Sequence, residues 1–273
     1  MRRNDAESCS IAQYTKKLFF AAKLDELDKR IRVGAVSYLN TRPLLYGLKR
    51  SGLMERIELM EEYPSRIAAM LLNDEIDVGL VPVAIIPQLA ESHIITDYCI
   101  GAEGEVASVA LFSEVPIEQV TKVLLDYQSR TSVSLARLLL KEYWKKEVIL
   151  EDTKEDFRSA IKGTTAGIVI GDRALEQRSV SPFIYDLGAA WKAHTGLPFV
   201  FAAWIANKAL GDDFEDAFNR ANAYGVTHID EVVAENNFAV YDLKKYYTEN
   251  ISYQLDAQKK EGMALFLKKL NLF

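Results

Sequence analysis

The chain has 273 residues, with 33 Lys plus Arg against 39 Asp plus Glu, and therefore a formal net charge of −6. Its hydrophobic content of 49% is enough for one large or two modest domains, and the acidic balance argues against nucleic acid or an anionic membrane surface as the main partner. With only three histidines and two cysteines, a cysteine-rich zinc site, an iron–sulfur cluster and a disulfide scaffold are excluded.

Residues 1–30 are polar and charged, and we expect them to form an N-terminal extension. Their apolar cluster, Leu18–Ala22, is too short for the core of a signal peptide. No later run reaches the roughly 18 apolar residues that are needed to span a bilayer. We therefore expect a cytoplasmic protein that has no membrane partner and keeps both cysteines as free thiols.

Ordered structure is expected to begin with a strand over Ile31–Val36, followed by a helix that starts near Pro43. Alternating apolar residues predict a strand at Arg56–Glu62, and Pro64 opens a helix with apolar residues at helical spacing. Asp77–Val81 is typical of a buried strand. This β-α-β-α-β order predicts parallel strands joined by helical crossovers, with ligands bound at the strand ends.

A second set of similar elements follows. We expect a strand at Lys122–Leu125, a helix at Val133–Trp144, a helix at Glu155–Lys162 and a buried strand at Ala166–Ile170. After Phe199–Ile205 the chain is predicted to be helical to its end. The expected C-terminal helices are Phe214–Tyr224, Ile229–Glu235 and Gln258–Leu270.

Because no Gly/Ser-rich linker separates these halves, we expect two α/β lobes between which the chain crosses near 111–113 and 203–206. Lobe 1 is predicted to hold residues 31–111 plus 206–273, and lobe 2 residues 112–205. A cleft between such lobes is a common site for a small ligand. No apolar heptad pattern indicates the oligomeric state, so a monomer and a homodimer both remain open.

Two connections at strand ends carry the polar groups that a ligand site needs. The first places Ser37, Tyr38, Asn40 and Arg42 after the first strand, although a helix-capping turn explains these residues equally well. The second precedes a helix, where N–H groups and the helix dipole attract anions. Its candidate binding residues are Ser129, Arg130, Thr131 and Ser132, and an ordinary helix cap is the alternative.

Weaker candidates lie elsewhere. Gly101–Val109 contains Ser108 and is typical of a hairpin or bulge. Gly171 and Asp172 end a buried strand. We expect Asp172 to cap a helix rather than act as a base. Asp186–Phe199 is rich in turns and aromatic residues and is a candidate wall of the cleft, as are Phe201 and Trp204. The three histidines lie far apart and are interpreted as surface or structural residues: His93, His194 and His228.

Taken together, the segments resemble the menaquinone-biosynthesis family of the futalosine route, in its chorismate dehydratase branch. The blocks that carry the resemblance occur in family order between about Ile31 and Leu270. They are Val36–Leu44, Asp77–Pro82, Ser108-Val109, Asp126–Ser132, Gly171–Leu175 and Tyr185–Trp204.

The resemblance implies a two-lobed α/β fold like that of type II periplasmic binding proteins, with a ligand cleft between the lobes. It implies conversion of chorismate to 3-[(1-carboxyvinyl)oxy]benzoate plus water, with no metal and no organic cofactor. Asn40 and Ser108 match the family's active-site pair. One departure is Ala107, where a polar or basic residue is expected. Thr131, Ser132 and either Arg42 or Arg130 are candidates for binding the two carboxylates of chorismate.

Neither Asn nor Ser has a pKa near neutrality, so neither is a good base. We hypothesise that the enolpyruvyl carboxylate of the substrate removes the ring proton, while Asn40 and Ser108 orient the departing hydroxyl; Asp172 is the fallback base. Three alternatives remain: the sister branch that forms 1,4-dihydroxy-6-naphthoate, a solute-binding protein of a transporter, and a ligand-sensing domain. The absence of an export signal and of a DNA-binding helix pair argues against the last two.

Overall fold

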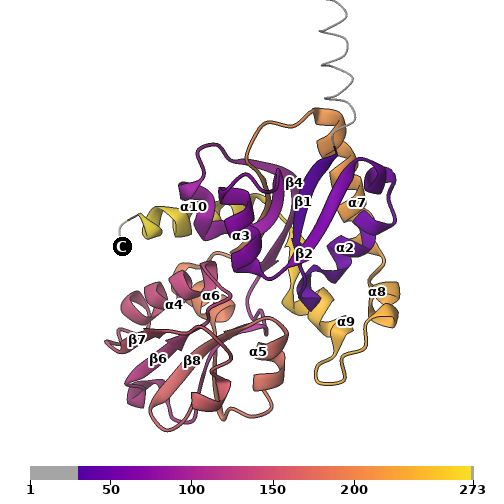
Figure 1. The fold of residues 1–273 in the computed structure, drawn as a ribbon. Helices are drawn as coiled ribbons and strands as arrows, with labels where there is room; N and C mark the ends of the chain where they lie inside the picture. The colour runs from indigo at the N-terminus through magenta and orange to yellow at the C-terminus, as the bar shows by residue number, and fades with distance from the viewer. Residues whose placement is uncertain (1–29, 272–273) are drawn as a thin grey trace, which may run out of the picture.

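The computed structural model describes residues 30–271, so the predicted extension, except for its last residue, lies outside the described part of the chain. Two lobes lie one above the other in Figure 1, each built on its own β-sheet. Lobe 1, the upper one, contains a six-stranded sheet, and lobe 2 contains a five-stranded sheet. The predicted division into two α/β lobes matches these two sheets.

The sheet of lobe 1 has the strand order β11-β4-β10-β3-β1-β2. Its strands are β1 (Ile31–Val36), β2 (Ile57–Glu62), β3 (Val78–Pro82), β4 (His93–Ala102), β10 (Phe199–Ala206) and β11 (Ser252–Gln254). β1 pairs in parallel with both β2 and β3, as the predicted β-α-β-α-β order requires. β10 lies antiparallel between β3 and β4 and brings the chain back from lobe 2.

The sheet of lobe 2 has the order β7-β6-β8-β5-β9. Its strands are β5 (Val109–Ser113), β6 (Lys122–Leu125), β7 (Ile149–Asp152), β8 (Thr165–Ile170) and β9 (Phe183–Asp186). β6 is parallel to β7 and β8, whereas β5 is antiparallel to β8 and β9. The carboxyl ends of β6 and β8 therefore lie at the same edge of this sheet.

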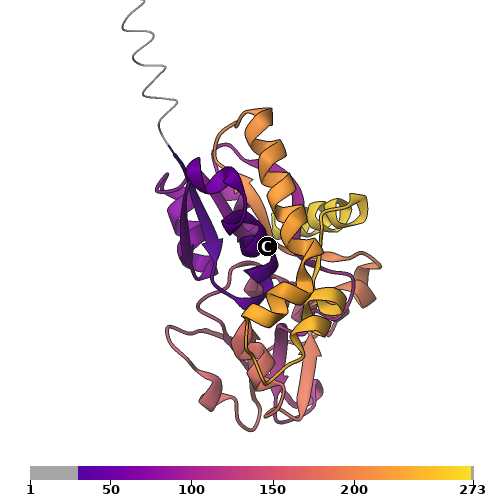
Figure 2. The same cartoon turned by 90° about the vertical axis from the view of Figure 1, so that its right-hand side faces the viewer.

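Helices cover the sheets and close the ends of the lobes (Figure 2). They are α2 (Arg42–Lys49), α3 (Pro64–Leu72), α4 (Thr131–Glu142), α5 (Asp172–Gln177), α6 (Leu187–Thr195), α7 (Asp212–Thr227), α8 (Ile229–Glu235), α9 (Leu243–Lys245) and α10 (Ala257–Leu270). In lobe 1, α3 packs against β1 and β3, while α7 packs against β4 and α10 against β10.

The two predicted crossings between the lobes need correction. β5 begins at Val109 and belongs to lobe 2, so the first crossing is made by residues 103–108 rather than 111–113. β10 already belongs to lobe 1, so the second crossing lies at 196–198 rather than 203–206. Both errors arise because strands next to a crossing are as apolar as any core strand, and hydropathy does not mark where a sheet changes.

Other local predictions also differ from the structure. The segment Glu155–Lys162 contains only a short 3₁₀ turn, Arg158–Ala160, instead of a helix. Gly101–Val109 is not a hairpin, because β4 and β5 belong to different sheets, whereas the alternative of a bulge agrees with the register shift of β10 opposite Ile100 and Gly101. The C-terminal region is interrupted by β11, and the turn-rich segment after Asp186 is the helix α6.

Most of the aromatic residues expected to line the cleft belong to the core instead. Trp191, Phe199 and Trp204 are fully buried. Trp191 and Phe199 pack edge to face with a ring-centroid distance of 5.3 Å, and the Trp191 indole N–H donates to the Pro198 carbonyl at 3.2 Å. Phe201 is the member of this group that lines the cavity between the lobes.

Helices α2 and α7 approach so closely that two glycines are required at their crossing. A Cβ atom on Gly225 would overlap the carbonyl oxygen of Pro43, and one on Gly47 would overlap that of Ala221. Backbone atoms cannot move aside as the end of a flexible side chain can. This contact fixes α2, and with it the segment that precedes α2 and follows β1.

We predict that Gly225→Ala lowers the free energy of unfolding by about 1–3 kcal/mol, because the added methyl overpacks a backbone contact. Gly52→Ala is the matched control, since no atom lies within 4 Å of its added Cβ. Urea unfolding followed by circular dichroism measures both. Equal stability of the two variants would contradict the tight crossing of α2 and α7.

Candidate functional site

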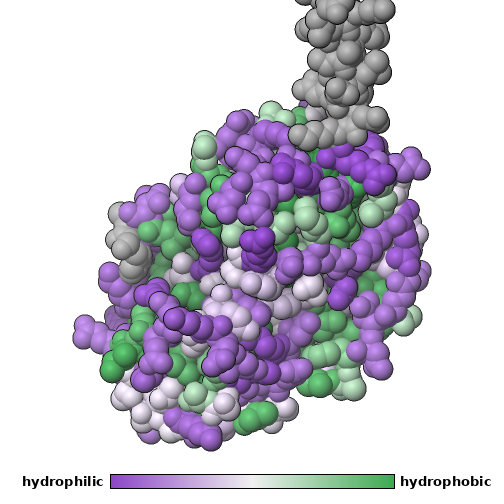
Figure 3. Space-filling model, viewed as in Figure 1, coloured by the Kyte–Doolittle hydropathy of each residue, from purple (hydrophilic) through white to green (hydrophobic). Residues whose placement is uncertain are grey.

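A cavity lies where the carboxyl ends of strands from both lobes meet. Its volume is about 50 Å³. It is lined by Val36, Tyr38, Asn40, Thr41, Pro64, Pro82, Ile100, Val109, Ser129, Thr131, Ser132, Ile170, Gly171, Phe201 and Ala202. Small-molecule pockets usually measure roughly 300–1,000 Å³, so the two lobes are closed on each other and must part to admit a ligand. In Figure 3 the zone between the lobes carries many residues of intermediate hydropathy.

The start of α4 supplies hydroxyl groups and helix-end N–H groups to this cavity. Ser129 Oγ accepts a hydrogen bond from the Ser132 N–H at 3.1 Å, so Ser129 caps the helix. Thr131 Oγ1 accepts from the Ala84 N–H of lobe 1 at 3.1 Å. The first-turn N–H groups and the helix dipole favour a negatively charged group here. Both the predicted cap and the predicted anion site are compatible with this arrangement.

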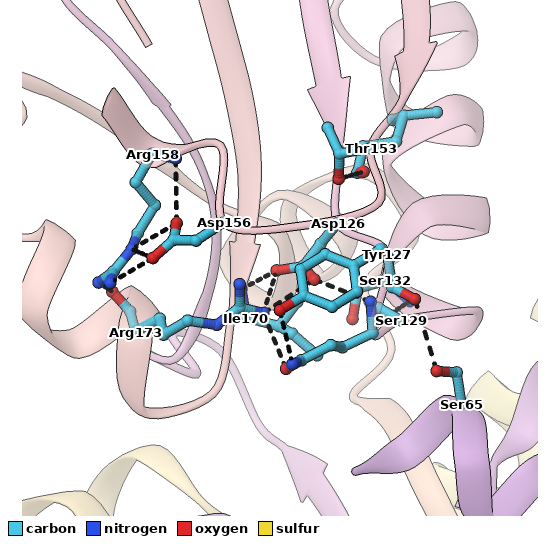
Figure 4. A network of polar contacts seen from close by, with 12 residues as sticks. Ser65, Asp126, Tyr127, Ser129, Ser132, Thr153, Asp156, Arg158, Ile170 and Arg173 are labelled. Carbon is cyan, nitrogen blue, oxygen red and sulfur yellow. Dashed lines mark hydrogen bonds and ion pairs between the residues drawn. The ribbon is translucent and has the colours of Figure 1, made fainter. Parts of the chain in front are cut away.

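A buried ion pair holds the loop before α4 (Figure 4). The Asp126 side chain is 0% exposed and lies 2.8 Å from the Arg173 guanidinium. Asp126 also accepts from the backbone N–H groups of Gln128 and Ile170, at 3.0 and 3.2 Å. Burial nevertheless raises the pKa of Asp126 above its usual value. The pair ties the end of β6 to the end of β8 and so fixes the direction of the α4 N-terminus.

Facing α4 is the connection after β1. The Tyr38 phenol donates to the Gln128 side chain of lobe 2, and its ring packs over Gly171. Gly171 has a positive φ of 65°, and an added Cβ would lie 2.8 Å from the ring. Asn40 Oδ1 accepts from the Thr41 hydroxyl at 3.1 Å, and its amide nitrogen has no partner among residues 30–271. An amide donor is thus available at the cavity wall.

The two candidate arginines differ in their environments. Arg42 donates to the Ser37 carbonyl at 3.3 Å and lies 3.6 Å from Glu61, and neither Arg42 nor Ser37 lines the cavity. Arg130 is half-buried directly before α4, between Ser129 and the first helical residue. Like Arg42, Arg130 does not line the cavity, but its guanidinium forms no hydrogen bond or ion pair within the described part of the chain.

The prediction that Asp172 caps a helix is wrong. Gly171 is the N-terminal cap residue of α5, and the Asp172 side chain makes no capping bond. Instead, Asp172 Oδ1 accepts from the Leu39 N–H of lobe 1 at 3.0 Å. Burial raises the pKa of this carboxyl group above its usual value. Asp172 therefore joins the two lobes.

Ser108 lies immediately behind the cavity wall formed by Val109 and Gly171. It is 0% exposed, and its carbonyl accepts from the Gly171 N–H at 2.9 Å. The preceding residue, Ala107, has a positive φ of 62°, which is an unfavourable conformation for a side chain with a Cβ. The turn is held by Asp186, whose carboxylate accepts from the N–H groups of Val106 and Ala107 at 3.1 and 2.8 Å.

Several residues of the site were not predicted from the sequence. Gln128 and Arg173 lie within the blocks that carry the resemblance, but their side chains bridge elements that are distant in sequence. Pro64 and Ile100 supply apolar cavity wall, and nothing in their local sequence distinguishes them from core residues. Only the fold reveals that these residues lie together.

Other polar groups are remote from the cavity. None of the three histidines lines the cavity. His93 contacts Glu91, His194 contacts Glu142 and His228 contacts the Tyr224 carbonyl. These contacts agree with their interpretation as structural or surface residues. Among residues 30–271 no group of three or more His, Cys, Asp or Glu side chains is placed to hold a metal ion. No helix in the same range is long and apolar enough to cross a membrane.

Two larger hollows of about 630 and 430 Å³ lie outside the interlobe cavity. The first is lined by the end of α4 and the following loop, the second by α2 and α7. Neither contains any of the predicted site residues, and a third hollow of about 220 Å³ outside the cavity contains one of them, Arg42. The interlobe cavity is therefore the candidate site.

Comparison with known proteins identifies a family and a fold. Residues 31–271 match the family model described as menaquinone biosynthesis. A chorismate dehydratase of Thermus thermophilus is 28% identical over 88% of this chain and 95% of that protein. A chorismate dehydratase of Campylobacter jejuni is 26% identical over 86% and 95%, respectively.

Solved structures of other proteins resemble this chain in fold. A protein of Archaeoglobus fulgidus aligns with a TM-score of 0.70 at 15% identity, covering 89% of this chain and 98% of its own. The periplasmic aliphatic sulphonate binding protein of Escherichia coli aligns with a TM-score of 0.57 at 18% identity, covering 90% and 91%. These similarities confirm the predicted two-lobed, periplasmic-binding-protein-like fold.

The raised pKa of Asp186 predicts that the stability of the fold depends on pH. Burial raises the pKa of Asp186 to about 6, despite the backbone N–H donors that favour its charged form. An unfolded aspartate titrates near 3.9, so between about pH 4 and 6 the folded chain binds more protons than the unfolded chain. The contribution of Asp186 to stability therefore decreases as the pH rises through this window, by about 3 kcal/mol in total.

We expect the difference in unfolding free energy between wild type and Asp186→Asn to fall by about 2 kcal/mol between pH 4 and 7, because the amide does not titrate. Denaturant unfolding at several pH values measures this difference. Asp97→Asn, at an exposed position, is the control for general charge effects. A difference that stays constant or increases with pH would contradict the raised pKa.

Proposed function

The chain belongs to the menaquinone biosynthesis family, and we propose that it is a chorismate dehydratase, as its relatives from Thermus thermophilus and Campylobacter jejuni are named. This lyase removes water from chorismate and forms 3-[(1-carboxyvinyl)oxy]benzoate, which is the first step of the futalosine route to menaquinone. The alignments with this chain cover 95% of each relative, so the comparison extends over nearly the whole of these enzymes.

The observation that carries the proposal is the cavity in which the α4 N-terminus faces Tyr38 and Asn40. Chorismate has two carboxylates, whereas the chain has a net charge of −6, so local donors must overcome a repulsive overall field. The hydroxyl of Ser132 and the first-turn N–H groups of α4 bind one carboxylate. The apolar wall formed by Ile100, Val109 and Phe201 accommodates the carbon ring.

Arg130 binds a carboxylate in this proposal, and Arg42 does not. The two terminal nitrogens of Arg42 are engaged by the Ser37 carbonyl and Glu61, and its buried Nε has no partner among the described residues. Arg130 directly precedes the helix that forms the anion site, and its guanidinium has no partner in the described part of the chain. A guanidinium forms strong charge-assisted hydrogen bonds with a carboxylate.

The reaction breaks a ring C–H bond and the ring C–OH bond. The electron pair of the C–H bond becomes the last double bond of the aromatic ring, and the hydroxyl leaves with a proton as water. Aromatisation supplies the driving force, so the protein has to hold the reacting geometry and assist the movement of protons. Asn40 donates its amide N–H to the departing hydroxyl, and Ser108 assists it from the segment that crosses between the lobes.

The enolpyruvyl carboxylate of the substrate is the base that takes the ring proton. Asp172 is less suitable, because its carboxylate accepts from the Leu39 N–H and it does not line the cavity. Its role is to keep the lobes together while the reaction proceeds. A reaction within a closed cavity also excludes water that would compete for the donors.

The alternatives receive weaker support. The two relatives carry the name of the dehydratase rather than that of the 1,4-dihydroxy-6-naphthoate synthase. Solute-binding proteins share the fold at identities too low to transfer a function. The cytoplasmic location and the choice between monomer and homodimer stay predictions.

Incubation of the purified protein with chorismate tests the proposal. We expect proton NMR to show the aromatic signals of 3-[(1-carboxyvinyl)oxy]benzoate as chorismate disappears. Asn40→Ala should lower kcat by about 10²–10³-fold, because it removes an oriented donor. Asn73→Ala removes an amide from an exposed position and should leave kcat unchanged. No turnover by wild type, or full turnover by Asn40→Ala, would contradict the proposal.

The role of Arg130 predicts an effect on substrate affinity. Arg130→Met should raise KM by about 10–100-fold with little change in kcat, because a charged hydrogen bond contributes about 1.5–3 kcal/mol. Arg137→Met is the control, since Arg137 lies on the same helix and pairs with Asp152 at 3.5 Å. Steady-state kinetics measure both variants. If both arginines affect KM equally, the assignment of Arg130 is wrong.

A further inference from the structure

Two buried tyrosines from the C-terminal part of the chain contact the proposed catalytic pair. The Tyr246 hydroxyl donates to Ser108 Oγ at 2.7 Å. The Tyr253 hydroxyl donates to the Asn40 carbonyl at 2.9 Å. Tyr246 is 0% exposed and Tyr253 is 4% exposed. The segment 246–254 thus reaches both members of the pair, although it is far from them in sequence.

An irregular helix brings Tyr246 to this position. Residues Tyr246–Asn250 form a π-helical turn between α9 and β11, closed by a hydrogen bond from the Ile251 N–H to the Tyr246 carbonyl at 2.9 Å. The Asn250 amide donates to the Glu105 carbonyl at 3.3 Å and so attaches the turn to the crossing segment before Ser108. Such π-turns are rare and occur often at functional sites.

The direction of the hydrogen bond between Tyr246 and Ser108 follows from their chemistry. A phenol is more acidic than an alkyl alcohol and is the better donor. Burial raises the pKa of Tyr246 far above its usual value, so the phenol keeps its proton at neutral pH. A serine hydroxyl has one hydrogen and two acceptor positions. With one acceptor position occupied by Tyr246, its hydrogen has no acceptor among the described residues.

We propose that Tyr246 is a positioning residue for the dehydration, because it fixes Ser108 Oγ and leaves the serine hydrogen to be donated to the departing hydroxyl of chorismate. The inference rests on the proposed function. Tyr246 does not touch the substrate: it acts through Ser108, whose neighbours Val109 and Gly171 line the cavity. Without the phenol, the serine hydroxyl rotates freely and its hydrogen is no longer directed.

A double-mutant cycle tests whether Tyr246 acts through Ser108. Tyr246→Phe keeps the ring and its packing against Tyr241 and Tyr247. We expect it to lower kcat about tenfold while KM changes less than about twofold. In the Ser108→Ala background, the same substitution should change kcat by less than about twofold, because the partner through which it acts is missing. Purely structural damage would lower kcat equally in both backgrounds.

Tyr241→Phe is the matched control. It removes a hydroxyl that bonds to Asn250, at 3.0 Å, from a ring 6.1 Å from that of Tyr246, and it should leave kcat unchanged. Thermal melting checks that all variants are folded. If Tyr246→Phe melts below the assay temperature, 3-fluorotyrosine is placed at 246 or 241 by codon suppression; kcat should then change only at 246.

The possible results separate the two proposals. If wild type turns over chorismate and Tyr246→Phe has equal effects in both backgrounds, the role of Tyr246 is overturned and the proposed function is intact. The same holds if wild type is active and fluorination has equal effects at 246 and 241. An absence of wild-type turnover overturns both. Wild-type turnover with an effect of Tyr246→Phe that disappears in the Ser108→Ala background supports both.

Discussion

A half-buried carboxylate of lobe 2, that of Asp172, accepts a hydrogen bond from the backbone N–H of Leu39 in lobe 1. A carboxylate without a hydrogen-bond partner would destabilise the closed state. The Leu39 N–H supplies that partner when the lobes close, and water supplies it when they open. The contacts of Tyr38 with Gln128, and of Thr131 with the Ala84 N–H, act in the same direction. The cavity exists only while these contacts hold, and opening the lobes takes the site apart.

Closure also explains why the site is built from helix ends and amides. When the lobes meet, the α4 N-terminus, Asn40 and the turn at Ser108 converge from three separate segments. Two of these segments are held by carboxylates outside the cavity: Asp126 holds the start of α4 and Asp186 holds the turn before Ser108. Such support keeps donors in place without reorganisation during the reaction. A chain with three histidines can therefore offer a preorganised site for an elimination that is driven by aromatisation.

Local patterns predicted the parts of the molecule that are local. β1, β2, α3 and β3 follow directly from hydrophobic periodicity and proline positions, and their parallel pairing follows from their order. The crossing points were misplaced, because hydropathy does not distinguish a strand of one sheet from a strand of the next. Asp172 was misread as a cap because its partner, Leu39, is more than a hundred residues away in sequence. Tyr246 had no local signal, since a buried tyrosine in a C-terminal helix is typical of a core.

The account is tested most directly by a crystal structure of Asn40→Ala with chorismate, in which slow turnover traps the substrate. We expect chorismate between the lobes, with one carboxylate within hydrogen-bonding distance of the first-turn N–H groups of α4 and the ring hydroxyl near Ser108. Chorismate bound in one of the outer hollows, or bound between the lobes with both carboxylates directed away from α4, would contradict it.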